Sequence, residues 1–403
     1  MPLPRPPEFQ YDLALLPLPG GRPAQMYDAD TERIIDAPKI AIQGGKIVAI
    51  GEDVRAELAQ MTRYVQEQQI ISPEIHDIHT HFHRGIVWSQ NVDADRDFHA
   101  WGTGYAVDAG SAGIFNGKEF FESLREKRTR THRKAFINIA PDGLTKPGGD
   151  TKIENFRHVD IDRTVGVARD YADVIVGVKV RIGEDECGDN WRNAMIAAIT
   201  ASEKIGKPLM VHVSNGPPPL EEILAMLRPG DIVTHCFHGK HPQDLFTILR
   251  DGKVLDAVLD AQHRGVIFDV GHGGGSFDWA VVTAAVARGF RPNTISSDFH
   301  DYSRHNARNQ PEVMSKILHA GIEMRHVFAM ATTNAARAIG RSPAEMPRIA
   351  VGSSANLAVI DILKSDQGGF PLTDGPSSPT QATTQYGSTF LQKAFLVTDG
   401  VAL

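Results

Sequence analysis

Alternating strand and helix patterns in the middle of the chain constrain its fold more than any other feature. The apolar runs Val174–Ile182 and Pro208–Val213 are typical of β-strands, and the amphipathic run Trp191–Ile205 between them predicts a helix. This rhythm is typical of βα units and a parallel sheet. It continues with predicted helices over Pro217–Leu227, Val254–His263 and Trp279–Arg288, and with predicted strands over Asp231–Cys236, Val266–Val270 and Thr294–Asp298.

The two ends of the chain show a different pattern. Lys39–Gly51 contains two short apolar strands joined by a Gly-Gly pair, which indicates a hairpin. Asn356–Asp361 and Ala394–Thr398 are further short strands. We therefore predict an α/β fold, in which a (β/α)8 TIM barrel carries a small β-sandwich domain built from both chain termini. The predicted boundaries are 72–345 for the barrel and 1–71 with 346–403 for the β domain.

Composition excludes several classes of function. The 403 residues carry a net charge of -7 and no basic block, so nucleic acid is not an expected partner. The chain has no apolar run of bilayer length, and its first residues lack the pattern of a secretory signal, so no membrane association is expected. Two cysteines favour a reduced cytoplasm. A homo-oligomer stays open, and Ser365–Ser388, rich in Gly, Pro, Ser and Thr, is predicted to be an exposed loop.

Residues able to bind metal recur at the ends of the predicted strands. His79 and His81 are two positions apart on an extended segment, so both side chains point the same way. Lys179 lies between two valines, and alternation places it with Arg181 on the opposite face. In a barrel, the carboxyl ends of the strands meet on one face, where active sites form. The remaining strand-end residues of this kind are His212, His235 and Asp298.

Each of these residues also has an ordinary explanation. Seventeen histidines make a chance His-x-His pair plausible, and Asp298 could cap the segment that follows it. Lys179 is harder to explain, because a buried lysine loses the hydration of its charge and needs an acidic partner or chemical modification. The ordered series over successive strands favours one shared metal site.

The sequence resembles the amidohydrolase superfamily of binuclear metal hydrolases, and within it the amidohydrolase/deacetylase branch with dihydroorotase-like members. The resemblance covers Ser72 to Gly340 and departs from the family pattern at Glu74, where a glycine is usual. It rests on the order of the ligands and on the segments VDAGSAG (107–113), VGVKVR (176–181), VHV (211–213), THCFHGK (234–240), DVGHGGGSF (269–277) and SDFH (297–300).

The resemblance implies a role for each ligand. His79, His81 and Asp298 would hold the more buried metal, and His212 with His235 the more exposed one. Lys179 would be carboxylated to N6-carboxylysine, which bridges both ions and replaces a buried cation by an anionic ligand. Histidine and carboxylate ligands suit Zn²⁺, so two zinc ions are the expected cofactors.

A metal-bridging hydroxide would be the nucleophile, and Asp298 would be the general acid and base. The branch implies a deacylase that cleaves the amide or ester bond of a small acylated amino or hydroxy carboxylate. A cyclic amide hydrolase of the dihydroorotase or hydantoinase type is the alternative. A non-catalytic scaffold of the same fold is an alternative of another class.

Two segments are candidates for substrate binding. Arg181 could bind a substrate carboxylate or form a salt bridge that closes the barrel top. The glycine-rich turn after the seventh strand could present backbone N–H groups to an oxyanion, or could simply be a tight turn. Its candidate residues are His272, Gly274, Gly275 and Ser276. His300 is a candidate partner of the metal ligands, and His83 and His238 have no assigned role.

Overall fold

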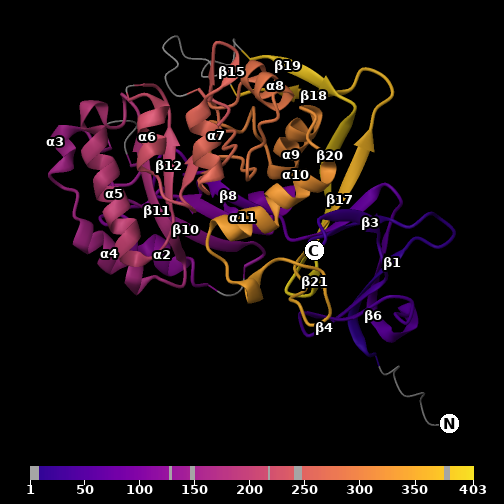
Figure 1. The fold of residues 1–403 in the computed structure, drawn as a ribbon. Coiled ribbons are helices and arrows are strands. Elements are labelled where there is room, and N and C mark those ends of the chain that lie inside the picture. Colours follow the sequence, from indigo (N-terminus) through magenta and orange to yellow (C-terminus); the bar gives the residue numbers. More distant parts are fainter. Residues whose placement is uncertain (1–8, 127–128, 146–149, 217, 240–246, 376–381) are drawn as a thin grey trace, which may run out of the picture.

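The computed structural model describes residues 9–126, 129–145, 150–216, 218–239, 247–375 and 382–403 (Figure 1). A curled sheet of seven parallel strands lies at its centre, and the strands follow one another in the sheet as they do in the chain. This is the predicted barrel topology. Its strands are β8 (His76–Thr80), β9 (Tyr105–Ala109), β10 (His132–Asn138), β11 (Ile175–Ile182), β12 (Leu209–Val213), β13 (Ile232–Thr234) and β16 (Ile267–Phe268).

The segment 294–299 closes the barrel in place of a regular eighth strand. Backbone N–H groups of Val270 and His81 donate to the carbonyls of Thr294 and Phe299, at 3.1 and 2.9 Å. These contacts join the segment to both edges of the sheet, as the isolated bridges at Thr294 and Phe299 do. The predicted strand Thr294–Asp298 is therefore in the expected place but is irregular. Asp298 has a φ of 47°, which is incompatible with a continuous extended strand.

Helices cover the outside of the barrel (Figure 1). The predicted helix over Trp191–Ile205 is present with the same bounds as α5, and it ends at Gly206 in the left-handed conformation. Residue 217, the predicted start of the next helix, lies outside the described residues. The helices are α1 (His99–Trp101), α2 (Lys118–Ser123), α3 (Ile153–Phe156), α4 (Ile161–Asp170), α5, α6 (Leu220–Met226), α7 (Asp256–His263), α8 (Trp279–Ala287), α9 (Gln310–His319), α10 (Met324–Ala331) and α11 (Thr333–Ala338).

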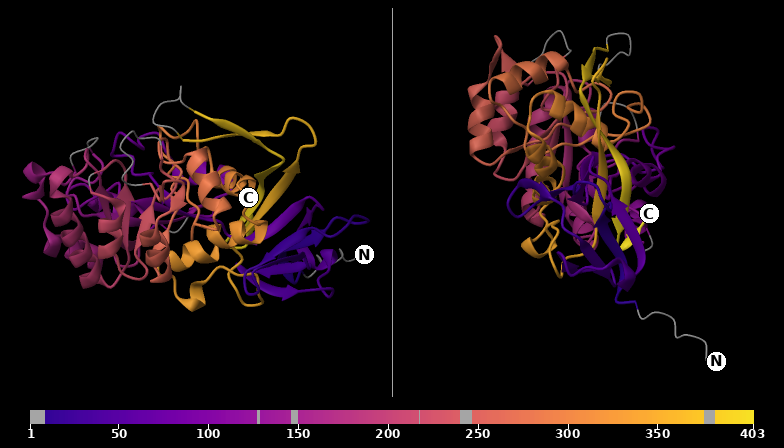
Figure 2. Two further views of the ribbon diagram at one scale, coloured as in Figure 1. Left: turned by 45° about the horizontal axis from the view of Figure 1, so that its top comes forward. Right: turned by 90° about the vertical axis from the view of Figure 1, so that its right-hand side faces the viewer.

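Strands from both chain ends form two further sheets beside the barrel (Figure 2). An apolar layer that includes Leu13, Ile42, Leu357 and Val397 joins the two sheets, which is the packing of a β-sandwich. The sheets contain β1 (Tyr11–Pro17), β4 (Ile40–Gln43), β5 (Lys46–Ile50) and β6 (Ala59–Val65), and β2 (Gln25–Asp28), β3 (Arg33–Asp36), β7 (Gln69–Pro73), β17 (Leu357–Lys364), β20 (Thr389–Thr398) and β21 (Val401–Ala402).

The prediction of a loop over Ser365–Ser388 is wrong for two stretches of that segment, and residues 376–381 within it lie outside the described part of the chain. β18 (Phe370–Thr373) and β19 (Thr384–Gly387) pair as an antiparallel ribbon. The indole N–H of Trp279 donates to the carbonyl of Leu372 at 3.0 Å, which fixes the ribbon to α8. Contacts with distant residues stabilise these strands, and local composition does not record such contacts.

None of the helices in the described part of the chain is both long and apolar enough to cross a membrane. The remaining short elements are β14 (Leu249–Arg250), β15 (Lys253–Val254), a π-helical turn (Ala94–Phe98) and 3-10 turns at Ala56–Leu58, Gly188–Asn190 and Pro343–Glu345.

Candidate metal centre

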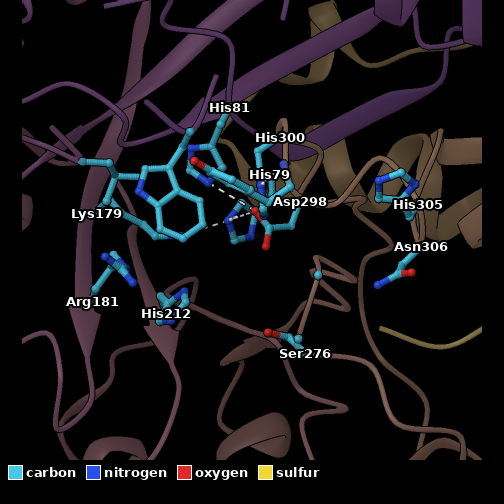
Figure 3. A pocket seen from close by; sticks show the side chains of 15 residues that line it. His79, His81, Lys179, Arg181, His212, Ser276, Asp298, His300, His305 and Asn306 are labelled. Carbon is cyan, nitrogen blue, oxygen red and sulfur yellow. Dashed lines mark hydrogen bonds and ion pairs between the residues drawn. The ribbon is translucent and has the colours of Figure 1, made fainter. Parts of the chain in front are cut away.

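The structure brings the six predicted metal ligands together at the carboxyl end of the barrel strands (Figure 3). β8 carries His79 and leads into His81, and β11 carries Lys179. β12 carries His212, His235 follows β13, and Asp298 lies on the closing segment.

Two of the candidate ligands lie against a carboxylate oxygen of a third. Oδ1 of Asp298 lies 3.4 Å from Nε2 of His79 and 3.2 Å from Nε2 of His81. Ligand atoms of His79, His235 and Asp298 all lie within 4.8 Å of one another, close enough to bind a single ion. Two imidazoles and a carboxylate on one side of the pocket are a donor set that suits Zn²⁺ and other divalent transition metals.

Lys179 reaches the same centre from β11. Its side chain is 1% exposed, and Nζ lies 3.3 Å from Nε2 of His79 and 3.4 Å from Sδ of Met210. Among the described residues, no carboxylate lies within 4 Å of this amine. Burial lowers the pKa of Lys179 to about 7. A buried amine without an acidic partner, among candidate metal ligands, is chemically suited to modification that gives it a negative charge.

His212 and His235 form the second group of ligands. Nδ1 of His212 lies 2.8 Å from Nε2 of His235, so these two nitrogens face the same point. Burial lowers the pKa of both imidazoles well below the ordinary value. The neutral ring, which has a free lone pair, is the form that binds metal.

The ring nitrogens of three ligands that face away from the centre are held by hydrogen bonds. Nδ1 of His79 lies 2.7 Å from Oγ1 of Thr234, and Nδ1 of His81 lies 2.8 Å from Oγ of Ser111. Nδ1 of His235 donates to the carbonyl of Gly271 at 2.6 Å. Such partners fix the orientation of metal-binding imidazoles, so all three rings direct Nε2 toward the centre.

Unusual backbone conformations also fix the ligands. His235 and Asp298 have φ values of 70° and 47°, a region that non-glycine residues rarely adopt. Gly110 and Gly273 lie directly against ligands. A Cβ atom on Gly110 would be 2.5 Å from Cβ of Lys179, and one on Gly273 would be 2.3 Å from Oδ2 of Asp298. Only glycine therefore fits beside these two ligands.

Five of the six candidate ligands, all except His235, line a cavity of about 520 Å³ at the mouth of the barrel. Burial raises the pKa of Asp298 there to about 6. Arg181 on β11 also lines the cavity. The other lining residues come from several loops and are Trp88, Leu144, Gly274, Gly275, Ser276, His300, Tyr302, His305 and Asn306.

Arg181 lines this cavity and is also part of a salt-bridge network. Its guanidinium contacts Oδ2 of Asp150 at 3.1 Å and Oε1 of Glu186 at 2.6 Å. Arg181 therefore forms a salt bridge, which was one of the two roles that the sequence suggested for it. It also leaves the residue on the cavity wall, where further N–H groups of its fork can meet a ligand.

The glycine-rich turn divides into two parts. Gly274, Gly275 and Ser276 line the cavity. His272 does not: its side chain is fully buried behind the wall, stacks on Phe277 and contacts Lys316. The geometry therefore gives no support for direct contact between the His272 side chain and substrate.

Sequence reasoning did not select several lining residues. Trp88, Tyr302, His305 and Asn306 belong to loops whose position depends on the closed barrel. Trp88 packs edge-on against His300 and Tyr302. Within the described residues its buried indole N–H has no hydrogen-bond partner, so a bound molecule could accept this bond. Only the adjacency of His300 and Tyr302 to Asp298 could have indicated part of this wall.

Three residues without an assigned role lie outside the ligand set. Glu74 contacts His132 at the opposite end of the barrel, and His83 stacks on Phe120. His238 is buried beyond β13.

Comparison with known proteins gives the family. A scan against protein-family models finds no match. The chain is 33% identical over 331 residues to a deacetylase from Agrobacterium fabrum, which covers 80% of this chain and 77% of that protein. The chain belongs to the amidohydrolase superfamily. This amidohydrolase is also 32% identical to a deacetylase from Brucella anthropi, with coverage of 80% and 78%.

Solved structures support the same fold for this amidohydrolase. A dihydroorotase structure has a TM-score of 0.82 and 28% identity, and the match covers 97% of this chain and 98% of that one. An adenine deaminase structure has a TM-score of 0.83 at 24% identity, with coverage of 98% and 99%, which bears on the fold alone. The predicted TIM barrel with a β domain is confirmed.

Proposed function

We propose that this amidohydrolase is a binuclear deacylase, which hydrolyses the amide or ester bond of a small acylated amino or hydroxy carboxylate. The chain is an enzyme of the metal-dependent amidohydrolase and deacetylase type. The proposal concerns its ions, its catalytic residue and its substrate. The observation that carries it is the buried, unpaired Lys179 among four histidines and Asp298, at the wall of a cavity large enough for a small molecule.

The ligands divide between two ions, most simply Zn²⁺. His79, His81 and Asp298 would hold the inner ion, and His212 with His235 the outer one. Lys179, carboxylated at Nζ, would contribute one oxygen to each. This modification fits the structure because it turns the buried amine into an anion beside neutral imidazoles, where bound cations would offset its charge.

The chain's own residues would then handle the proton and the substrate. Bound ions would supply Lewis acidity and a water of lowered pKa. Asp298 takes the proton released during attack on the acyl carbon and returns it to the leaving nitrogen or oxygen. The products are a carboxylic acid and an amine or alcohol. The buried position of Asp298, which raises its carboxyl pKa to about 6, suits a group that both accepts and donates a proton.

The cavity wall offers groups that suit a carboxylate-bearing substrate. Arg181 presents a guanidinium held in place by two acids, and Gly274, Gly275 and Ser276 present backbone and hydroxyl donors on another part of the wall. The names of the relatives support deacylation. Hydrolysis of a cyclic amide is the second candidate, which the dihydroorotase structure favours.

A substrate panel tests the proposal. The zinc-loaded protein should hydrolyse one or more N-acyl-D- or L-amino acids or acyl hydroxy acids faster than their carboxamide counterparts and faster than cyclic ureides, with bicarbonate present. Faster turnover of a ureide would favour the cyclic amide hydrolase. Equal turnover of acids and carboxamides would contradict recognition of the carboxylate.

Lys179→Ala tests the metal centre itself. The parent protein should contain about two ions per chain and lose activity on chelation, whereas Lys179→Ala should lose activity and bind fewer ions. Short carboxylic acids should restore part of the activity, because they can replace the missing bridge. His235→Ala is the control, which these acids should not rescue. Full activity of Lys179→Ala would contradict the carboxylated lysine.

A further inference from the structure

A second lysine is fully buried close to the cavity but is not among its lining residues. Lys316 lies on α9 and is 0% exposed, although a lysine is almost never buried without partners. The proposed chemistry gives it no part.

All three N–H groups of Lys316 have an acceptor. Nζ lies 2.9 Å from Nε2 of His272 and 3.4 Å from Oε1 of Glu312, and it also donates to the backbone carbonyl of Asn306. Because Lys316 donates to Nε2 of His272, the hydrogen of that ring is on Nδ1, which lies 3.0 Å from the carbonyl of Gly273. The amine is therefore fully satisfied in this position.

Two of these acceptors belong to two different segments that line the cavity. His272 begins the turn whose next residues are Gly273, which packs on Asp298, and Gly274, which lines the cavity. Asn306 lines the cavity itself, on the other side of Asp298 from Lys179 (Figure 3). Lys316 thus connects the turn after β16 to the loop after Asp298 from behind.

We propose that Lys316 is a positioning residue, which sets the substrate-facing wall by holding the His272 turn and the Asn306 backbone at a fixed separation. The third acceptor, Glu312, anchors the amine to α9 and is itself held by Arg308 at 2.9 Å. Lys316 thus fixes both wall segments to α9, in addition to the backbone hydrogen bonds that His272 and Gly273 donate to the carbonyls of Ser296 and Ser297.

Lys316→Met tests this proposal, because methionine keeps an unbranched apolar stem of similar shape but removes the three donors. We expect KM for the best substrate of the panel to rise about tenfold, with a smaller change in kcat and an unchanged metal content. The control is Lys207→Met. Lys207 holds the carbonyls of Ala172 and Ile175 at the opposite end of the barrel, so its loss should lower Tm without changing KM.

Glu312→Gln is a second variant, which keeps Lys316 and its other two contacts. It should raise KM less than Lys316→Met does. A KM within twofold of the parent value in a folded Lys316→Met protein would overturn the proposal, as would an equal rise in Lys207→Met.

The KM measurements rest on the proposed function, because they need a substrate from the panel. Hydrogen exchange tests the role of Lys316 without any substrate. In metal-loaded Lys316→Met, backbone amides of 271–276 and 303–307 should exchange faster than in the parent, while those of β11 and β12 should not. If the parent protein hydrolyses nothing in the panel, the proposed function fails and exchange still decides the role of Lys316. Unchanged exchange in both segments would overturn that role.

Discussion

At the scale of single residues, Thr234 connects His79, a proposed metal ligand, to a buried acid. Its hydroxyl lies 2.7 Å from Nδ1 of His79 and donates to Oδ2 of Asp269 at 2.8 Å. Since that hydroxyl donates to Asp269, it accepts from His79, which places the ring hydrogen on Nδ1 and leaves Nε2 free for metal. One hydroxyl thereby sets both the tautomer and the orientation of His79.

Replacement of Thr234 by Val should weaken metal binding by about 10–100-fold, because the shape is kept while the partner of His79 is lost. Metal affinity measured by competition with a chelator checks this. Thr294→Val is the matched control, since Thr294 donates to the same Asp269 at 2.7 Å but, within the described part of the chain, its hydroxyl makes no hydrogen bond to a candidate metal ligand. Equal losses in the two variants would show that only the environment of Asp269 matters.

Sequence reasoning could select the proposed ligands, which the structure brings together, but not the residues that hydrogen-bond to them. The ligands are recognisable because alternation and strand ends define which way His79, His81 and Lys179 point. Thr234 and Ser111 contact histidines from other strands, and those pairings depend on the register of the closed sheet. No local pattern in the sequence encodes that register, so these residues appear only in the structure.

At the scale of elements, the turn after β16 sets the position of Asp298. Gly273 has a φ of 55°, and a Cβ atom there would be 2.3 Å from Oδ2 of Asp298. Gly273→Ala should therefore displace that carboxylate and reduce kcat about 100-fold. The left-handed backbone should also cost about 1–2 kcal/mol of stability. Assays of kcat and thermal unfolding check both effects.

Gly289→Ala separates the backbone effect from the contact. Gly289 has a φ of 84° but nothing within 4 Å of its added Cβ. The Gly289→Ala protein should lose about as much stability as the Gly273→Ala protein and keep full activity. An active Gly273→Ala protein would mean that the turn can move away from Asp298 without consequence.

Elements that are determined by their own residues were predictable from the sequence. Elements that depend on contacts with distant residues were not. The Ala-rich pattern of α5 and the glycine after it define that helix within the sequence itself. The β18–β19 ribbon instead depends on Trp279, and the segment 294–299 depends on pairing with both edges of the sheet. The family resemblance supplied the closed barrel that periodicity alone left open.

At the scale of the whole molecule, a charged cluster lies at the end of the barrel opposite the candidate metal centre. Glu74 precedes β8 and contacts Nδ1 of His132 at 2.9 Å and Nη1 of Arg341 at 3.7 Å. His132 also faces Asp399, at 3.6 Å, near the carboxyl terminus. The cluster joins β8, β10 and the C-terminal strands, and it gives Glu74, where the family usually has glycine, a structural role.

The same cluster makes stability depend on pH through His132. Glu74 raises the pKa of His132 to about 9. Burial alone would raise the pKa of Glu74, but the positive charge and hydrogen bond of His132 outweigh it, and the pKa of Glu74 falls to about 2. A raised histidine pKa stabilises the fold fully below the unfolded value of about 6.5, and this contribution is lost as pH rises through about 9. The lowered Glu74 pKa stabilises the fold above about 4.5, and that contribution is lost as pH falls toward 2.

His132→Gln should therefore lower Tm most between about pH 4.5 and 6.5, and the difference from the parent should shrink as pH rises through about 9. Thermal unfolding of both proteins between pH 5 and 10 measures this. His76 belongs to the same cluster, and burial lowers its pKa to about 4, so in the parent protein it stays neutral over this pH range. His158→Gln, at an exposed position, is the control and should show no such trend. A constant difference at every pH would mean that His132 stabilises the barrel by packing on Tyr105, with its charge making no contribution.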